Sequence, residues 1–171
     1  NKTNKIKSVN TLKVCFQSNK IKGFNTDIYG FELSLKRFIK NKKMKAIVFG
    51  NGGAAKTIKY VLEKEKIQYI QVSRRNKKSI KYRELEKKHF DNNQLIINST
   101  TVGMHPHEKE KININYDYIN EQHFVFDLIY NPPKTEMLKE CLKRGAKIKN
   151  GLEMLKLQAK KSFDIWTNEK Y

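Results

Sequence analysis

A glycine-rich turn is the first feature of the sequence with recognisable chemistry. Gly50, Gly52 and Ala55 form the pattern G-x-G-x-x-A between the apolar run Ala46–Phe49 and a helical pattern over 54–65. Gly50 permits a tight turn, Gly52 lets a pyrophosphate approach the backbone, and Ala55 allows the helix to pack closely on the strand. The start of the helix then offers free N–H groups to phosphate oxygens. The pattern predicts a nucleotide site whose phosphate loop consists of Gly50, Asn51, Gly52, Gly53 and Ala54.

Arg74 and Arg75 directly follow the next predicted strand, over 68–73. In sites for NAD, a carboxylate at about this place accepts a hydrogen bond from the ribose 2′-hydroxyl. Here residues 73–78 contain no acid, and four of the five residues 74–78 are cations. Guanidinium groups bind a 2′-phosphate through paired charged hydrogen bonds. Since only five of the 36 basic residues are arginine, this placement is not explained by the lysine-rich composition, and NADP is the predicted cofactor.

Short strands that alternate with helices must position these residues. Strands are expected over 46–49, 68–73, 95–98 and 124–128, and helices over 54–65, 79–89 and 134–144. This alternation predicts an α/β fold with a Rossmann-like, doubly wound parallel sheet that is covered on both faces. Asp127 ends the last of these strands, where a role beside the cofactor and a capping role are equally expected.

The two ends of the chain follow other patterns. Residues 9–16 and 20–24 read as a hairpin, which needs further sheet neighbours to be stable. A helix is expected over 28–40, and another over 151–167. The apolar residues along one side of the second helix are expected to pack it against the protein: Leu152, Leu155, Ala159, Phe163 and Trp166.

The composition excludes several classes of protein. The net charge of +19 is compatible with nucleic-acid binding, but the lysines are spread over the chain, and stacking aromatics interleaved with arginine do not occur. A basic nucleic-acid-binding protein therefore remains only as an unfavoured alternative. No apolar run reaches the ~20 residues that a membrane span requires. Cys15 and Cys141 fit buried thiols in a reducing, cytoplasmic compartment, and His105 and His107 are not expected to hold a metal.

Several of these segments together resemble shikimate dehydrogenase over nearly the whole chain. The segments follow the order and spacing of that family: 9–11, 23–27, 50–55, 73–76, 98–104, 127–132 with Lys134 and Thr135, and 150–155 with Gln158 and Ala159. The resemblance implies an NADP-dependent oxidoreductase that reversibly reduces 3-dehydroshikimate to shikimate in aromatic amino-acid biosynthesis. It implies four parts: 1–27, the remnant of a second, substrate-binding α/β domain; 28–44, a connecting helix and link; 45–150, the NADP-binding Rossmann domain; and 151–171, a helix that returns toward the substrate domain.

The resemblance also implies roles for single residues. Asp27 corresponds to one half of the catalytic acid–base pair, and the expected substrate contacts are Asn10, Asp27, Tyr130 and Gln158. The expected cofactor contacts, besides the phosphate loop, are Ser73, Arg74 and Arg75 at the adenosine phosphate, Asn98 and Thr100 along the cofactor, and Gly151 and Met154 beside the nicotinamide.

The family's catalytic lysine is the main departure, because its motif lies upstream of 9–11. Lys2, Lys5 and Lys7 do not lie in such a motif. The sequence is therefore expected to be the C-terminal part of a shikimate dehydrogenase that binds NADP(H) without measurable turnover. A Rossmann module that holds NADP without catalysis is the alternative. The sequence leaves open whether quinate is a substrate, and whether the protein is a monomer or a homodimer.

Overall fold

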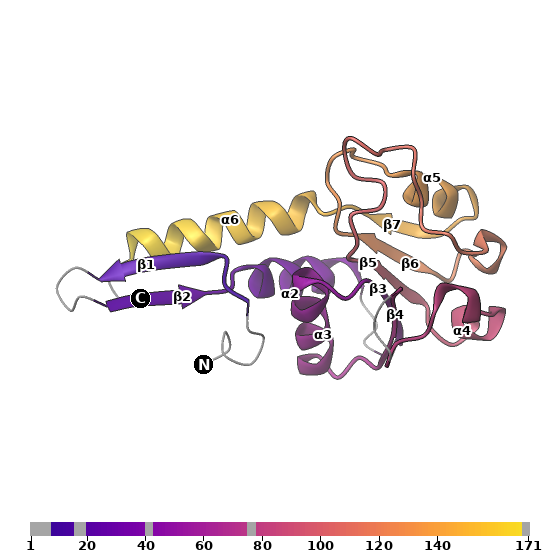
Figure 1. The fold of residues 1–171 in the computed structure, drawn as a ribbon, viewed down its shortest axis with the longest axis horizontal. Coiled ribbons are helices and arrows are strands. Elements are labelled where there is room, and N and C mark those ends of the chain that lie inside the picture. Colours follow the sequence, from indigo (N-terminus) through magenta and orange to yellow (C-terminus); the bar gives the residue numbers. More distant parts are fainter. Residues whose placement is uncertain (1–7, 16–19, 40–42, 75–77, 169–171) are drawn as a thin grey trace.

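The computed structural model describes residues 8–15, 20–39, 43–74 and 78–168, so Arg75 and Lys77 lie outside the described residues. The chain begins with a two-stranded hairpin, continues through a β–α alternation and ends in a long helix (Figure 1). The strands are β1 (Thr11–Cys15), β2 (Lys20–Phe24), β3 (Ala46–Phe49), β4 (Tyr69–Val72), β5 (Leu95–Asn98), β6 (Phe124–Asp127) and β7 (Lys147–Lys149). The helices are α2 (Asp27–Phe38), α3 (Gly53–Lys64), α4 (Lys87–Asp91), α5 (Glu136–Lys143) and α6 (Leu152–Thr167), with single 3-10 turns at Tyr82–Glu84 and Tyr116–Tyr118.

The larger sheet has the strand order β4-β3-β5-β6-β7, and every neighbouring pair is parallel. This confirms the predicted α/β fold. The chain order reverses beside β3, because β4 lies on one side of it and β5 on the other. In such doubly wound sheets, ligands bind outside the carboxyl ends of the strands at this switch point. The glycine turn after β3 lies at that place.

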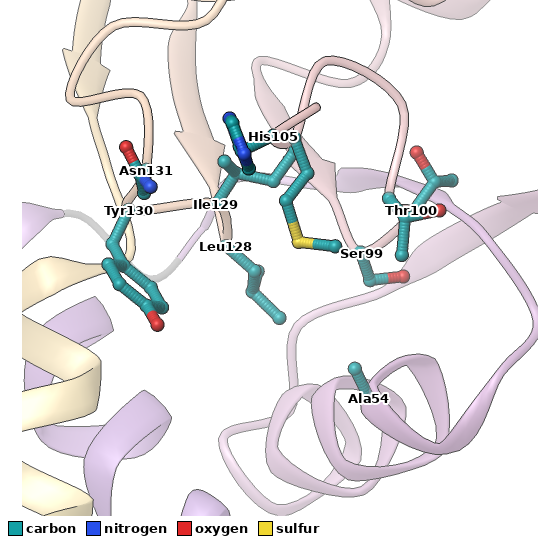
Figure 2. A pocket seen from close by; sticks show the side chains of 10 residues that line it. Ala54, Ser99, Thr100, His105, Leu128, Ile129, Tyr130 and Asn131 are labelled. Carbon is teal, nitrogen blue, oxygen red and sulfur yellow. The ribbon is translucent and has the colours of Figure 1, made fainter. Parts of the chain in front are cut away.

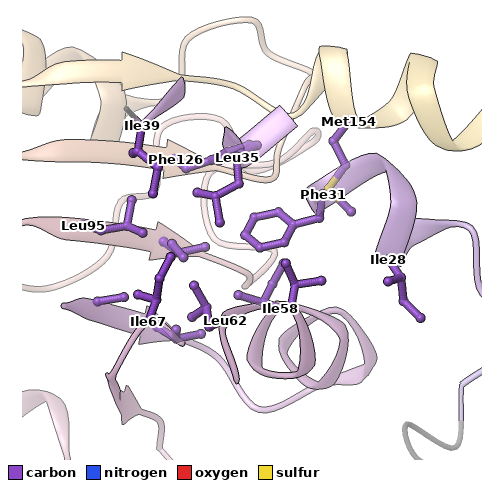
Figure 3. Packing of buried hydrophobic residues seen from close by; sticks show 14 residues of the cluster. Ile28, Phe31, Leu35, Ile39, Ile58, Leu62, Ile67, Leu95, Phe126 and Met154 are labelled. Atoms are coloured by element: carbon purple, nitrogen blue, oxygen red, sulfur yellow. The ribbon is translucent and has the colours of Figure 1, made fainter. Parts of the chain in front are cut away.

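Two apolar layers cover the two faces of the sheet. Successive residues of a strand point to opposite faces, so Ala46 and Val48 lie in one cluster while Ile47 and Phe49 lie in the other. The first cluster brings Phe31 of α2 and residues of α3 and α6 against the sheet (Figure 3). The second cluster is formed with residues of α4 and α5. The four strand residues of β3 are fully buried, as predicted for a central parallel strand.

The hairpin lies apart from the large sheet and beside the far half of α6 (Figure 1). The Lys13 ammonium donates to the carbonyl of Ile165 at 3.0 Å, and the Trp166 indole N–H donates to the carbonyl of Leu12 at 2.9 Å. Nearer its start, α6 crosses α2 at Gly30, where a Cβ atom would lie 2.6 Å from the carbonyl oxygen of Met154. Close contact between these helices therefore depends on the missing side chain.

The helix expected over 79–89 is wrong in most of its length. Ile80 forms a parallel bridge with Val72, and its backbone bonds with Gln71 and Ser73 extend the edge of the sheet. Ile80, Tyr82 and Leu85 then pack against the second cluster. The apolar spacing of these three residues therefore reflects packing at the edge of the sheet and not one side of a helix. Within 79–91, only Lys87–Asp91 is α-helical. Strand β7 was not predicted.

The expected packing side of the last helix is also wrong. Phe163 and Trp166 are 61% and 56% exposed, and Leu152 is 41% exposed. The residues of α6 that are buried are Met154, Ser162 and Ile165, which lie on another side of the helix. The side of α6 that faces the hairpin and α2 makes polar contacts through Gln158 and Ser162. None of the described helices is both long and apolar enough to cross a membrane.

Candidate active site

The glycine turn has the geometry that a phosphate loop requires. Gly50 adopts φ +113°, and a Cβ atom there would lie 2.6 Å from the Ser99 hydroxyl, so a side chain is excluded both by conformation and by space. The Gln71 amide supports the turn from β4, donating to the Gly50 carbonyl at 2.7 Å and to Asn51 Oδ1 at 3.0 Å. At Gly52 a Cβ atom would meet no atom within 4 Å. A ligand can therefore approach the backbone of Gly52 directly.

The start of α3 is arranged to receive an anion. Gly52 is its N-cap residue, no side chain caps it, and its first turn holds no acidic residue. The first N–H groups of a helix have no partner within the helix and carry the positive end of its dipole. The phosphate loop predicted from the sequence thus presents these N–H groups beside the open space at Gly52.

Arg74 is exposed directly after β4, next to this turn. It lies close enough to Tyr82 to lower the pKa of that hydroxyl, although burial, the larger effect, raises it. Ser73 is only 5% exposed, and its hydroxyl shares a 2.7 Å hydrogen bond with that of Ser79. Arg74 is thus placed to meet a ligand at this end of the site, while the Ser73 hydroxyl is engaged within the loop.

A pocket of about 380 Å³ opens beyond the carboxyl ends of β5 and β6. Figure 2 shows Thr100 and Tyr130 on opposite sides of it, with Leu128 between them. Its lining is formed by Ala54, Ser99, Thr100, Thr101, Met104, His105, Leu128, Ile129, Tyr130 and Asn131. The predicted residues Ala54, Thr100 and Tyr130 therefore share one cavity.

Asp127 connects the two loops of this pocket, which follow β5 and β6, through buried hydrogen bonds. Its carboxylate accepts hydrogen bonds from Asn98 Nδ2 at 3.0 Å, from the Thr135 hydroxyl at 2.6 Å and from the backbone N–H of Ile129 at 3.1 Å. Asn98 Oδ1 in turn accepts from the backbone N–H and the hydroxyl of Thr100. Burial raises the pKa of Asp127 to about 6, although the three hydrogen bonds lower it.

Asp127 and Asn98 therefore organise the loops rather than project into the pocket, since both side chains are fully buried and mutually bonded. Sequence reasoning missed Thr135 as a member of this cluster. The available signal was its position three residues before Leu138, whose N–H the Thr135 hydroxyl caps at the start of α5.

Gly151 joins α6 to the same loop. Its N–H donates to the Ile129 carbonyl at 3.0 Å, and a Cβ atom would lie 1.9 Å from the Leu128 carbonyl oxygen. Met154, one turn further, is 9% exposed and packs in the first apolar cluster with Phe31 (Figure 3). The start of α6 is thus pressed against the pocket wall, with Gly151 at the contact.

Three of the predicted substrate residues come together beside the crossing of α2 and α6. Asn10 Nδ2 donates to Asp27 Oδ1 at 3.0 Å and to Gln158 Oε1 at 3.2 Å. Burial raises the pKa of Asp27 above its ordinary value, and the hydrogen bond from Asn10 acts in the opposite direction. A carboxyl with a raised pKa and two amides can bind and orient a hydroxylated ligand and exchange a proton with it.

The histidines do not add to this site. His105 lines the pocket but bonds through Nδ1 to Glu108 at 2.5 Å, and His107 lies on the same exposed loop. His123 is buried, and its Nε2 lies 3.2 Å from the Phe90 carbonyl oxygen, away from the pocket lining. Within the described ranges, no group of three potential ligand residues is placed to hold a metal ion.

Comparison with known proteins shows which proteins have a similar sequence. No protein-family model matches the sequence. The shikimate dehydrogenase (NADP(+)) of Pelagibacter ubique is 42% identical over 171 residues, which cover 93% of this chain and 62% of that enzyme. The chain is homologous to the shikimate dehydrogenases. It spans less than two thirds of the length of these relatives.

Solved shikimate dehydrogenases share the fold. The enzyme from Aquifex aeolicus is 34% identical with a TM-score of 0.82, covering 96% of this chain and 63% of that one. The enzyme from Thermus thermophilus, solved in complex with NADP(H) and shikimate, is 25% identical with a TM-score of 0.81, covering 97% of this chain and 64% of that one. The hairpin, the sheet and α6 of this chain thus have the arrangement found in shikimate dehydrogenases.

Proposed function

We propose that this chain carries the NADP-binding domain and one side of the substrate site of a shikimate dehydrogenase, which reversibly reduces 3-dehydroshikimate to shikimate in aromatic amino-acid biosynthesis. The observation that carries the proposal is the open phosphate loop at the switch point of the sheet with Arg74 beside it. The homology to enzymes named as NADP-dependent shikimate dehydrogenases supports it.

The residues present fit NADP. The uncapped start of α3 and the open space at Gly52 suit a pyrophosphate, and the exposed Arg74 suits a 2′-phosphate. Arg75, outside the described residues, and Ser73 are proposed to complete the adenosine-phosphate contact. The pocket beyond β5 and β6 is proposed to receive the nicotinamide, with Gly151 and Met154 at its edge. When bound, NADPH supplies the hydride, and the protein supplies position and proton transfer.

The polar residues beside α2 and α6 are proposed to act on the substrate. The amides of Asn10 and Gln158 bind its hydroxyl groups, and the Tyr130 ring extends from the pocket wall, where it is 49% exposed. Asp27 holds or moves the proton at the substrate oxygen whose carbon exchanges the hydride. The raised pKa of Asp27 brings its carboxyl nearer to the range in which it can both accept and return a proton.

The proposed partners are a small-molecule substrate and NADP(H), with no specific nucleic acid and no membrane. We propose a cytoplasmic location, which agrees with the buried, unpaired thiol of Cys141.

Calorimetric titration with NADP+ and NAD+ tests the cofactor assignment. NADP+ should bind more tightly, and Arg74→Ala should weaken NADP+ binding by about 1.5–3 kcal/mol, as for a lost charged hydrogen bond, with little effect on NAD+. Arg83→Ala is the matched control, because Arg83 is also exposed and its loss changes the net charge equally. Equal affinity of the wild type for both nucleotides would refute the arginine argument. Equal losses in the two variants would assign the effect to net charge instead.

A further inference from the structure

A second layer of polar side chains lies directly behind Asn10, Asp27 and Gln158. It consists of the hydroxyl groups of Thr11, Thr26 and Ser162, which are 2%, 2% and 7% exposed. They come from β1, the start of α2 and the middle of α6, respectively. Asn10, in contrast, is exposed, and Asp27 and Gln158 are half-buried. The more accessible polar side chains therefore contact a layer of buried hydroxyl groups.

The three hydroxyls bond to one another and to the outer layer. Ser162 Oγ lies 2.8 Å from Thr11 Oγ1 and 3.0 Å from Thr26 Oγ1. Thr26 Oγ1 reaches both Asn10 Oδ1 and Gln158 Oε1 at 3.2 Å, and Thr11 Oγ1 reaches Asn10 Oδ1 at 3.2 Å. Ser162 Oγ also donates to the backbone carbonyl of Gln158 at 3.0 Å. Every hydroxyl hydrogen therefore has an acceptor within the cluster.

One backbone group decides which way the amides face. The N–H of Thr26 points at Asn10 Oδ1 at 2.9 Å, and a backbone N–H can only donate. The oxygen of the Asn10 amide must therefore face Thr26, and its NH₂ group must face Asp27 and Gln158. Because this NH₂ group donates to Gln158, the oxygen of the Gln158 amide faces inward as well. Among the described residues, Nε2 of Gln158 has no hydrogen-bond partner.

Thr26 is also unusual for its position. It is the N-cap residue of α2, where a threonine hydroxyl ordinarily accepts a bond from the helix, but its hydroxyl makes no such bond. Asn25 Oδ1 accepts the N–H of Ile28 in its place, at 3.3 Å. The hydroxyl is turned to Asn10, Gln158 and Ser162 instead. The bonds that it makes are therefore explained by the polar cluster and not by the stability of the helix end.

We propose that the hydroxyls of Thr26, Thr11 and Ser162 form a positioning layer that holds the Asn10 and Gln158 amides in the orientation imposed by the Thr26 N–H, and so keeps the Gln158 NH₂ group directed toward an acceptor on a hydroxylated ligand. That this ligand is shikimate rests on the proposed function. The positioning of the amides does not, because it follows from hydrogen bonds within the chain.

The test measures the order of the side-chain NH₂ groups of Asn10 and Gln158 by ¹⁵N relaxation in the full chain. Thr26→Val keeps the shape and the backbone N–H but removes the hydroxyl. The ratio of bonded to released Gln158 amide should fall about 2- to 12-fold, the value of one neutral hydrogen bond, and its order parameter should fall with it. Ser162→Ala should act in the same direction, and Thr26→Ser should restore the order.

Thr57→Val is the matched control, because Thr57 is 1% exposed and, among the described residues, its hydroxyl accepts only the Asn25 amide, which is not a member of the cluster. Unchanged Gln158 order in both Thr26→Val and Ser162→Ala would overturn the proposal. So would an equal loss of order in Thr57→Val, since the effect would then be one of general stability.

Added shikimate separates this proposal from the proposed function. Shifts of the Gln158 NH₂ resonances in the wild type that are reduced in Thr26→Val support both. If Thr26→Val disorders the amide but shikimate shifts no resonance in the wild type, the positioning layer stands, and the assignment of Gln158 as a shikimate contact is wrong.

Discussion

Asp127→Asn offers a direct test of the buried cluster that joins the two pocket loops. The carboxyl of Asp127 is fully buried, and burial raises its pKa from 3.8 to about 6 in the folded protein. The folded state therefore holds this proton more tightly than the unfolded chain does. This gives the folded state extra stability below the unfolded pKa, which is lost as pH rises through about 6. The full effect of such a shift is about 3 kcal/mol.

The variant isolates this contribution because an amide does not titrate. Linkage with pKa values of 3.8 and about 6 gives a change of about 2 kcal/mol between pH 4.5 and pH 7. The free energy of unfolding of the wild type minus that of Asp127→Asn should therefore fall by about 2 kcal/mol over this range. Urea unfolding at four or five pH values measures both proteins, and titrations common to them cancel in the difference.

Asp91→Asn is the matched control, since Asp91 is an exposed carboxylate that, within the part of the chain that the structure describes, is paired only with Lys87 one turn away. Its difference from the wild type should stay within about 0.5 kcal/mol at every pH. A flat difference for Asp127→Asn would show that the carboxyl is not held with a raised pKa. A difference that grows with pH would show that its hydrogen bonds outweigh its burial, and the reasoning would be wrong in sign.

Two glycine substitutions are expected to separate folding from cofactor binding. Gly151→Ala places a methyl group 1.9 Å from the Leu128 carbonyl oxygen, so the backbone must move, and thermal unfolding should show a loss of about 3 kcal/mol or more. Gly52→Ala meets no atom within 4 Å, so stability should change by less than about 1 kcal/mol, whereas calorimetry should show NADP+ affinity reduced at least about tenfold, because the methyl group takes the place of a phosphate. Normal NADP+ binding by Gly52→Ala would place the phosphates elsewhere.

Local patterns sufficed for the sheet and the phosphate loop. Leu95–Asn98 is a continuous apolar run that ends in a polar residue, and the strand has those bounds. Gly50 and Gly52 fall where a tight strand–helix turn needs them, and only the structure distinguishes their reasons: positive φ and crowding at Gly50, and open space at Gly52. Such features are encoded within a few neighbouring residues, so the sequence reveals them.

Features that depend on distant partners could not be predicted in this way. Ile80 looks helical in its own segment because its bridge to Val72 appears only when the sheet edge exists. Thr11, Thr26 and Ser162 are separated by up to 151 residues in the chain, and nothing local marks them as neighbours. The side of α6 that packs was mispredicted because Ser162 and Gln158 meet α2 and the hairpin through polar contacts. Phe163 and Trp166 stay more than half exposed, although the Trp166 indole N–H reaches the hairpin at the Leu12 carbonyl.

The crossing at Gly30 has a mechanical consequence. Helix α6 has 16 residues and is therefore about 24 Å long, at ~1.5 Å per residue. The hairpin packs beside the half of this helix that is farther from the sheet. At this crossing a Cβ atom on Gly30 would lie 2.6 Å from the Met154 carbonyl oxygen and 3.2 Å from the backbone nitrogen of Gln158, so the crossing is the natural pivot for any rocking of α6 and the hairpin against the sheet. A rotation of about 5° there would move the end of α6 by only about 1–2 Å, and the groups at the pivot by much less. Asp27 and Gln158 therefore lie where such motion disturbs distances least.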